Sequence, residues 1–289
     1  MKVVLLGAGG MLAHDLRAAA PPTVELRSFM HAELDVRDHN ALRETIRAHR
    51  PELIINAAAY TRVDDAESNS QTAFAVNGAA PEAIGRAALE VGAAVVHFST
   101  DYIFDGVAGR PYREDDEPSP LSTYGRSKLE GEVGLRKSGA AHLVIRTQWL
   151  FGLHGRSFPR SMWERATGGQ RTKVVADQIG RPTYTTDLAR VVWQLVALGA
   201  TGTLHVANAG TATWHEVACR VFAAAAAADL LAPCSTKDYP TPARRPTAAV
   251  LDTGRFERLS GGPMPRWEDA LARFMAEVMT TGARRTRAY

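Results

Sequence analysis

Cysteine is scarce in this chain of 289 residues, which contains only Cys219 and Cys234. Two cysteines cannot form a disulfide framework or a four-cysteine metal site, and such low usage is typical of a reducing compartment. We therefore expect a cytoplasmic protein that has neither disulfides nor a catalytic metal.

Long apolar runs and a strong charge of one sign are also missing. Glycines break the N-terminal stretch MKVVLLGAGG too early for a signal peptide or a membrane span. Lys and Arg total 34 against 31 acidic residues, which gives a formal charge of +3. The most concentrated basic stretch is the tail at 282–289, which we expect to be a solvated end. This weak balance favours neither nucleic acid nor a membrane as a partner.

The remaining composition is that of a globular protein, with 45% hydrophobic and 22% charged residues. Apolar runs such as KVVLL, ELIIN, AVVHFS and HLVIR alternate with segments of helical spacing. This alternation predicts an α/β fold with a Rossmann-type, doubly wound parallel sheet. Prolines interrupt the pattern in the second half. We expect a dinucleotide-binding domain over 1–150 and a smaller, intertwined lobe over 151–289 that is mainly substrate-binding, with some segments returning to the first domain.

A glycine-rich turn follows the first expected strand directly. Gly7 permits a tight turn, Gly10 lets a pyrophosphate approach the backbone, and Ala13 allows close packing of helix on strand. Free N–H groups at the start of the helix then face the phosphates. Glycines also serve ordinary turns, but the order of strand, glycines and helix predicts a dinucleotide site.

The second expected strand ends in VELRSFMH, without a carboxylate that could bind the ribose 2'-hydroxyl of NAD. Arg27 or His31 could instead contact a 2'-phosphate, although an arginine can simply be exposed at a strand end. The pattern favours NADPH, with NADH also accepted.

Residues suited to proton transfer follow the fourth expected strand. Ser99, Thr100 and Asp101 end that strand, and Tyr124 precedes Lys128 by four residues on an expected helix. Residues four apart share a helix face, so we expect the Lys128 ammonium to lower the phenol pKa from its reference value of about 10. Tyr124 would then be a general acid or base, Thr100 would bind a carbonyl, and Lys128 would also reach the nicotinamide ribose. The Tyr-x-x-x-Lys spacing is common by chance, but its place after the glycine turn and the Ser-Thr pair favours catalysis.

Several longer motifs occur in one order along the chain. They are NAAAYTRVDDAE at 56–67, STDYIFDG at 99–106, YGRSK at 124–128, RTQWLFG at 146–152, DQIGRPTY at 177–184 and YPTPARRP at 239–246. With these motifs the chain resembles the dTDP-4-dehydrorhamnose reductase family of the extended short-chain dehydrogenases. The sequence departs from that family at Arg62, where a small residue is usual.

The resemblance implies roles for residues that spacing alone does not assign. It implies that the cofactor is contacted by Met11, Leu12, Asp35, Val36, Ala59, Tyr60 and Thr61, together with Tyr124 and Lys128. It also implies that Thr100, Asp101 and Trp149 face the sugar. Some members of the family form metal-bridged dimers through clustered glutamates, but Asp15 and Thr186 stand near those places here. We therefore expect no metal, and a homodimer is one possible state.

Two arginines, Arg244 and Arg245, lie in the proline-framed stretch YPTPARRP. Guanidinium groups match phosphate oxygens, so this loop suits a nucleotide diphosphate. Neighbouring side chains on an extended loop point in opposite directions, which leaves open whether Arg244 or Arg245 is the ligand.

The expected reaction is NAD(P)H-dependent reduction of the 4-keto group of a dTDP-linked 4-keto-6-deoxy-L-hexulose, foremost dTDP-4-dehydro-L-rhamnose to dTDP-L-rhamnose. One alternative is a 4-ketoreductase for another nucleotide deoxysugar in secondary metabolism. A second alternative is a non-catalytic, nucleotide-binding regulatory subunit, which an intact set of Thr100, Tyr124 and Lys128 argues against.

Overall fold

A computed structural model describes the backbone of residues 1–286 and the side chains of residues 1–280. The expectation of a solvated basic tail at 282–289 concerns side chains outside this described part. None of the helices between residues 1 and 286 combines the length and the hydropathy needed to span a bilayer.

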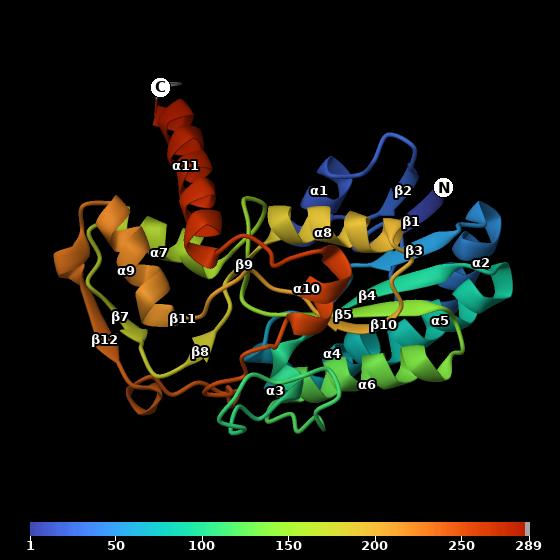
Figure 1. Ribbon diagram of the computed structural model, residues 1–289, viewed down its shortest axis with the longest axis horizontal. Coiled ribbons are helices and arrows are strands. Elements are labelled where there is room, and N and C mark those ends of the chain that lie inside the picture. The colour runs from blue at the N-terminus through green and yellow to red at the C-terminus, as the bar shows by residue number, and fades with distance from the viewer. Residues whose placement is uncertain (287–289) are drawn as a thin grey trace.

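The centre of the molecule is a parallel sheet in the strand order β10-β5-β4-β3-β1-β2 (Figure 1). Apolar and β-branched residues fill the inner strands because both faces of the sheet are covered there. The six strands are β1 (Lys2–Leu6), β2 (Glu25–Phe29), β3 (Leu53–Asn56), β4 (Ala94–Thr100), β5 (His142–Thr147) and β10 (Gly202–His205). This topology is the doubly wound Rossmann type that the alternating pattern predicts.

Helices cover the two faces, and successive strand residues alternate between them. Val3 and Leu5 point into one buried cluster, whereas Val4 and Leu6 point into the other. The first face is covered by α1 (Met11–Ala18), α8 (Thr185–Ala197) and α10 (Gly254–Ser260). The second face is covered by α2 (His39–His49), α5 (Ala80–Val91) and α6 (Thr123–Lys137). Short helical turns precede α5, namely α3 (Asp65–Ser68), α4 (Ser70–Phe74) and a π-helical turn (Ala75–Ala79).

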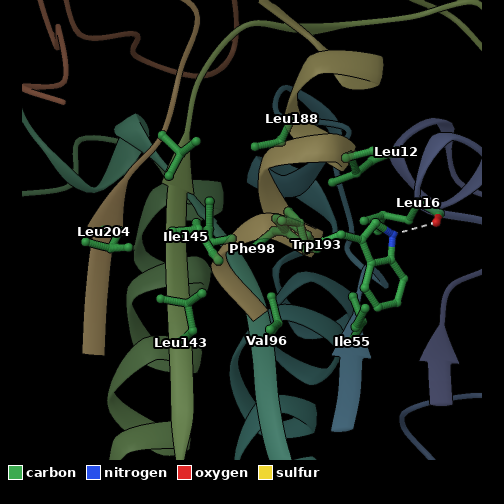
Figure 2. Close-up of a cluster of buried hydrophobic side chains, with 14 of the residues drawn as sticks. Leu12, Leu16, Ile55, Val96, Phe98, Leu143, Ile145, Leu188, Trp193 and Leu204 are labelled. Carbon is green, nitrogen blue, oxygen red and sulfur yellow. Dashed lines mark hydrogen bonds between the residues drawn. The ribbon is translucent and has the colours of Figure 1, made fainter. Parts of the chain in front are cut away.

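Two elements from the second half of the chain complete this layered structure. Strand β10 extends the sheet beside β5, and α8 packs on α1. Trp193 of α8 is buried in the first cluster, and its indole N–H donates to the Leu16 carbonyl of α1 at 2.9 Å (Figure 2). Burying the ring while satisfying its N–H fixes α8 to the sheet.

A smaller lobe lies beside the sheet and has its own buried cluster, which includes Phe222, Phe274 and Trp267. Its helices are α7 (Phe158–Thr167), α9 (Trp214–Ala224) and α11 (Trp267–Thr286), the last of which projects from the body in Figure 1. Its short strands pair two by two and are β6 (Leu150–Phe151), β7 (Thr172–Val175), β8 (Ile179–Gly180), β9 (Thr183–Tyr184), β11 (Ala212–Thr213) and β12 (Leu231–Cys234). Short 3-10 turns lie at Asp101–Ile103, Ala228–Leu230 and Thr236–Asp238.

Candidate active site

A cavity of about 400 Å³ lies at the carboxyl ends of β1, β2 and β3. Ligands of doubly wound sheets bind at this edge. Of the residues expected to hold a cofactor, the cavity lining includes Gly7, Gly10, Asp35, Val36, Ala59 and Tyr60. The other lining residues are Gly9, His31, Leu34, Arg37, Ala57, Ala58, Arg62, Thr72 and Val76.

The glycine turn has the geometry that a bound pyrophosphate requires. Gly7 has φ +77°, and a Cβ there would lie 2.6 Å from main-chain atoms of Ala58, so any other residue would be strained and would clash. The Gly10 N–H donates to the Gly7 carbonyl at 3.0 Å and places Gly10 as the cap of α1. Around a Cβ built on Gly9 there is open space within 4 Å. The N-terminus of α1 is thus open to an anion.

The floor of the cavity is held by Asn77, whose importance the sequence motifs did not reveal. Its side chain accepts from the Tyr60 N–H at 2.8 Å and donates to the Tyr60 carbonyl at 3.0 Å. Asn77 also donates to the Ser127 hydroxyl of α6 at 3.0 Å. Among the described side chains, the Tyr60 hydroxyl is a buried group without a hydrogen-bond partner. An orphaned hydroxyl beside an open glycine cradle fits a polar ligand here.

The remaining cofactor residues expected from the sequence are placed differently. The Leu12 side chain is part of the hydrophobic core, so only its main chain can face a ligand. Met11 begins α1, and Thr61 is exposed beside the lining residue Tyr60. Arg27 does not line the cavity: it is opposite Val4, in the middle of β2, and its guanidinium lies over the Phe29 ring. The expectation for Arg27 treated a mid-strand residue as a strand end.

The cavity also contains a carboxylate that the end of β2 did not suggest. After β2 the chain turns back, so both His31 and Asp35 line the wall. Arg37 donates to Asp35 from Nε at 2.9 Å and from Nη2 at 2.5 Å. This pairing lowers the pKa of Asp35, which is therefore ionised at neutral pH.

The expected catalytic residues come together where β4 ends and α6 begins. Thr100 is the last residue of β4, and Tyr124 and Lys128 are one turn apart near the start of α6. Ser122 caps α6 by accepting from the Gly125 N–H at 3.1 Å. A second anchor is Glu67 of α3, whose carboxylate accepts from the N–H and the hydroxyl of Thr123, both at 2.8 Å. An acid at a helix N-terminus is stabilising, and here it fixes the residue next to Tyr124.

The electrostatics of Tyr124 differ from the expectation that Lys128 lowers its pKa. Removal from water raises the pKa of Tyr124, a hydrogen bond with Thr100 partly opposes this, and Asp101 and Tyr102 raise it further. The Lys128 ammonium instead donates to the Phe98 carbonyl at 2.6 Å and lies 3.5 Å from His97 Nε2. Burial lowers the pKa of Lys128 to about 8. Tyr124 is thus a neutral phenol with a proton to donate.

Asp101 is almost fully buried beside this phenol. Thr100 donates to its Oδ1 at 3.1 Å, and Gln148 donates to its Oδ2 at 3.2 Å. Burial raises the pKa of Asp101 to about 7, and the Thr100 bond opposes part of that rise. The sequence suggested that Asp101 faces the sugar, but both of its oxygens are engaged by protein groups. Gln148 was not recognised, because its role depends on contacts with Asp101 and with Ala249.

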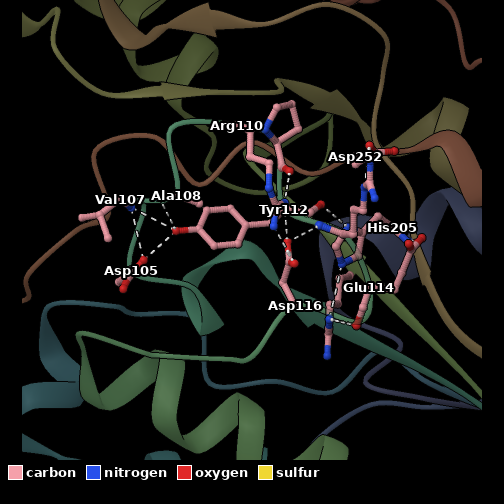
Figure 3. A network of polar contacts seen from close by, with 12 residues as sticks. Asp105, Val107, Ala108, Arg110, Tyr112, Glu114, Asp116, His205 and Asp252 are labelled. Atoms are coloured by element: carbon pink, nitrogen blue, oxygen red, sulfur yellow. Dashed lines mark hydrogen bonds and ion pairs between the residues drawn. The ribbon is translucent and has the colours of Figure 1, made fainter.

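The loop after Asp101 is fixed by a polar network (Figure 3). The Tyr112 hydroxyl donates to Asp105 at 2.6 Å, and the Tyr112 carbonyl lies 3.0 Å from His205 Nδ1 of β10. Burial lowers the pKa of His205 to about 3, so the ring is neutral. His205 also donates its main-chain N–H to Glu114 at 3.0 Å. The network ties the loop that follows β4 to the edge of the sheet.

A second cavity, of about 420 Å³, lies between the glycine-turn half and the smaller lobe. The segment 60–64 borders both cavities, because Tyr60 lines the first and Asp64 the second. Its lining combines aromatic and basic side chains, among them Phe158, Arg165, Lys173, Trp214, Tyr239 and Arg245.

The structure separates the two arginines of the proline-framed loop. Arg245 lines the second cavity, donates to Asp64 at 2.7 and 2.9 Å, and donates to the Thr241 hydroxyl at 2.6 Å. Its guanidinium lowers the pKa of Asp64. Arg244 is exposed and is not among the residues lining this cavity. Of the two, Arg245 is the one that lines this cavity.

Trp149 has a left-handed backbone with φ +50° and stacks on Trp214, with ring centroids 3.6 Å apart. Gly180 accommodates the indole, because a Cβ there would lie 2.4 Å from Trp149 Cε2. Trp214, rather than Trp149, is among the residues lining the second cavity. Trp149 therefore contacts this cavity through Trp214.

The pair Asp15 and Thr186 joins α1 to α8, with the Thr186 hydroxyl donating to Asp15 at 3.2 Å. Within the described side chains, no group of three or more His, Cys, Asp or Glu residues could hold a metal ion.

Comparison with known proteins decides the family. The model of the RmlD substrate binding domain matches residues 1–280. The chain belongs to this family. The dTDP-4-dehydrorhamnose reductase of Escherichia coli is 36% identical over 298 residues, covering 98% of this chain and 100% of the relative. A probable dTDP-4,6-dihydroxy-2-methyloxan-3-one 4-ketoreductase of Streptomyces antibioticus is 38% identical, covering 96% of each chain.

Solved structures agree with this membership. The structure of dTDP-4-dehydrorhamnose reductase from Bacillus anthracis in complex with NADP superposes with a TM-score of 0.92 at 34% identity. It covers 96% of this chain and 99% of the other. The extended short-chain dehydrogenase fold that the motifs predict for this chain is therefore confirmed.

Proposed function

We propose that this chain reduces the 4-keto group of a dTDP-linked 4-keto-6-deoxy-L-hexulose, converting dTDP-4-dehydro-L-rhamnose to dTDP-L-rhamnose, with NADPH as the preferred reductant and NADH also accepted. The observation that carries the proposal is the neutral phenol of Tyr124 beside Thr100, at the strand edge where a glycine cradle opens. Relatives 34–36% identical over nearly the whole chain are dTDP-4-dehydrorhamnose reductases, which supports this substrate.

The first cavity fits a nicotinamide dinucleotide. The open backbone at Gly9 and Gly10 would hold the pyrophosphate, and Asp35, Val36 and Tyr60 would border the rest of the molecule. When bound, the cofactor supplies a hydride to the carbonyl carbon. The chain supplies the proton, because Tyr124 is held in its protonated form and can give that proton to the carbonyl oxygen.

Thr100 and Lys128 assist Tyr124 in different ways. Thr100 hydrogen-bonds the phenol and can align the carbonyl oxygen with it. Lys128, fixed to the Phe98 carbonyl of β4, is a buried cation on the same side of α6. It would bind ribose hydroxyls and favour the phenolate that remains after the proton has left.

The second cavity would hold the nucleotide half of the substrate. Arg245 offers a charged fork to the diphosphate, and Trp214, Phe158 and Tyr239 offer ring faces to the base. Arg165 and Lys173 add positive charge to the same wall. The smaller lobe over 151–289 would thus be the main substrate-binding part of the chain, as its composition led us to expect.

A second candidate function is reduction of the 4-keto group of another nucleotide deoxysugar in secondary metabolism. The 38% identity to the Streptomyces antibioticus ketoreductase favours it. The same Tyr124 and Thr100 chemistry would serve either sugar. A non-catalytic regulatory role is disfavoured by the assembled Thr100, Tyr124 and Lys128.

One experiment separates these functions. The purified chain is incubated with NADPH and a panel of nucleotide-linked 4-keto sugars, NADPH oxidation is followed by absorbance, and the products are identified by NMR. Oxidation with the dTDP-4-dehydro-L-rhamnose sample, giving dTDP-L-rhamnose, supports the proposal. NADPH oxidation with another sugar alone selects the second candidate. If NADPH is not oxidised with any of the sugars, a regulatory subunit is favoured. A cytoplasmic location and a homodimeric state remain predictions; light scattering after size exclusion measures the latter.

A further inference from the structure

The start of α6 is bound by a carboxylate from a distant part of the chain. Glu67 of α3 precedes Thr123 by 56 residues, and its Oε1 accepts from the Thr123 main-chain N–H at 2.8 Å. Its Oε2 accepts from the Thr123 hydroxyl, also at 2.8 Å. Thr123 is buried, so both bonds form away from bulk water. Two hydrogen bonds to one charged group fix the orientation of Thr123 as well as its position.

These bonds lie directly beside the proton donor. Thr123 is the first residue of α6 and Tyr124 is the second. The N–H groups of a first helical turn have no partner within the helix. Glu67 accepts from Thr123 on one side of Tyr124, and Ser122 accepts from Gly125 on the other side. The direction in which the Tyr124 ring leaves the helix therefore depends on both anchors.

Glu67 also follows closely on the segment that borders both cavities. Tyr60 lines the first cavity, and Asp64 lines the second, where it accepts from Arg245 at 2.7 Å. Helix α3 begins directly after Asp64, and Glu67 is its third residue. One short stretch of chain thus joins the walls of both cavities to the start of α6.

We propose that Glu67 is a positioning residue that acts through Thr123 and holds the Tyr124 phenol in the geometry that proton transfer requires. A misplacement of about 1 Å can cost a hundredfold in rate, so a rigid anchor next to the donor has a large effect on turnover. The inference rests on the proposed function in taking Tyr124 as the proton donor.

Other contacts near Tyr124 cannot replace this anchor. Arg126 donates to the Thr123 hydroxyl at 2.9 Å, but it belongs to α6 itself and cannot fix that helix to another element. Gly125 packs on the Tyr102 carbonyl, where a Cβ would lie 2.2 Å away. That contact brings the helix close to the turn after β4, but it leaves the N–H and the hydroxyl of Thr123 to Glu67.

The test compares two substitutions of Glu67 in the full chain, with NADPH and dTDP-4-dehydro-L-rhamnose. Glu67→Ala should lower kcat by about tenfold or more, while KM for the sugar and Kd for NADPH stay within about threefold. Glu67→Gln should keep kcat within about threefold, because its amide oxygen can accept from the N–H and its amide nitrogen can donate to the hydroxyl oxygen. The matched control is Ser68→Ala, because Ser68 donates to the Asp65 carbonyl within α3.

Two further measurements separate positioning from a loss of folded protein. The ratio of kcat in H2O to kcat in D2O should rise in Glu67→Ala, because proton transfer from a misplaced phenol limits turnover more strongly. A smaller share of folded enzyme would lower both rates alike. The double variant Glu67→Ala/Tyr124→Phe should turn over about as slowly as Tyr124→Phe alone, since Glu67 acts through the phenol.

A measurement without substrate tests the anchor itself. Hydrogen exchange of the Thr123 amide, followed by NMR, should be faster by about tenfold or more in Glu67→Ala. Unchanged kcat or unchanged exchange in Glu67→Ala, an isotope ratio that does not rise, a Gln variant as impaired as the Ala variant, or multiplied losses in the double variant would each overturn the inference. Absence of NADPH oxidation by the unmodified chain would instead count against the proposed function, and the exchange measurement would still decide whether Glu67 holds α6.

Discussion

The Lys128 ammonium is bound to the Phe98 carbonyl at 2.6 Å and is thereby held against β4, one helical turn from the Tyr124 phenol. Burial raises the pKa of Tyr124, so the phenol keeps its proton in the free protein. A ketoreductase needs a donor that is protonated when the carbonyl arrives. A protonated Tyr124 and a Lys128 held by the main chain are consistent with the proposed roles of proton donor and ribose ligand.

Replacing Tyr124 by Phe should abolish most turnover while leaving cofactor binding intact. The ring still packs at 5.5 Å from that of Tyr102, but the proton donor is gone. A positioned acid contributes about a hundredfold or more to the rate, so kcat should fall by at least that factor. Steady-state kinetics and NADPH titration on the same preparation measure both quantities. Near-normal turnover in a folded variant would remove Tyr124 from the mechanism.

Arg245→Ala should raise KM for the nucleotide sugar by about tenfold, because hydrogen bonds to charged groups contribute about 1.5 to 3 kcal/mol. The turnover number should change less, since the diphosphate is held alike in ground and transition states. Arg244→Ala is the matched control: its neighbour lines the cavity, whereas Arg244 is exposed. If Arg244→Ala raised KM and Arg245→Ala did not, Arg244 rather than Arg245 would bind the diphosphate.

Replacing Asp101 by Asn should stabilise the protein more at pH 8 than at pH 5, when the variant is compared with the unmodified protein at the same pH. The pKa of Asp101 is raised by burial to about 7, above its ordinary value, so the folded state holds a proton that the unfolded state has lost. Stability from this group is complete below the unfolded pKa and falls as pH rises from about 4 to 7. Asn does not ionise, so the variant does not lose this stability as the pH rises. As the pH rises from 5 to 8, the Tm of the variant should increase by several degrees relative to the Tm of the unmodified protein. About 1 kcal/mol shifts Tm by 2–4 °C in proteins of 150–250 residues. A constant difference in Tm across this range would contradict the assigned pKa.

Glu132→Gln should destabilise the fold by about 3 to 5 kcal/mol, because it leaves a buried charge without its partner. Glu132 of α6 is fully buried and binds Arg146 of β5 at 2.7 Å. Glu130→Gln on the same helix is the control, since Glu130 is exposed. Urea unfolding of both variants gives the free energies. Equal stabilities would show that Arg146 is satisfied by its other contacts, the Glu114 carbonyl and His205.

Local spacing was enough to select the candidate site residues that lie within single elements. The glycine turn, Thr100 at a strand end and the Tyr124–Lys128 spacing each depend on a few consecutive residues, and the structure places all of them at one sheet edge. Fold class followed in the same way, because the alternation of apolar runs and helical segments fixes the parallel sheet.

The residues missed are those whose roles depend on distant partners. Asn77 forms hydrogen bonds with Tyr60, 17 residues away, and Gln148 with Asp101, 47 residues away. Asp64 accepts from Arg245, 181 residues away. No local pattern encodes such pairs. Arg27 lies away from the cavity because β2 ends at Phe29. The bond from Lys128 to the Phe98 carbonyl could not be foreseen, because that carbonyl belongs to another element.

Strand β10 has a consequence for how the protein is made. The sheet has β10 at its edge, beside β5, and Trp193 of α8 is buried in the cluster on its first face. A nascent chain therefore contains the glycine turn and Tyr124 long before the rest of the sheet and its covering helices have been synthesised. The sheet requires residues up to His205, the end of β10, and the cover of its first face also requires α10, which ends at Ser260. We expect synthesis to leave a half-built sheet exposed until that point, so the first 150 residues expressed alone should aggregate or be degraded rather than fold.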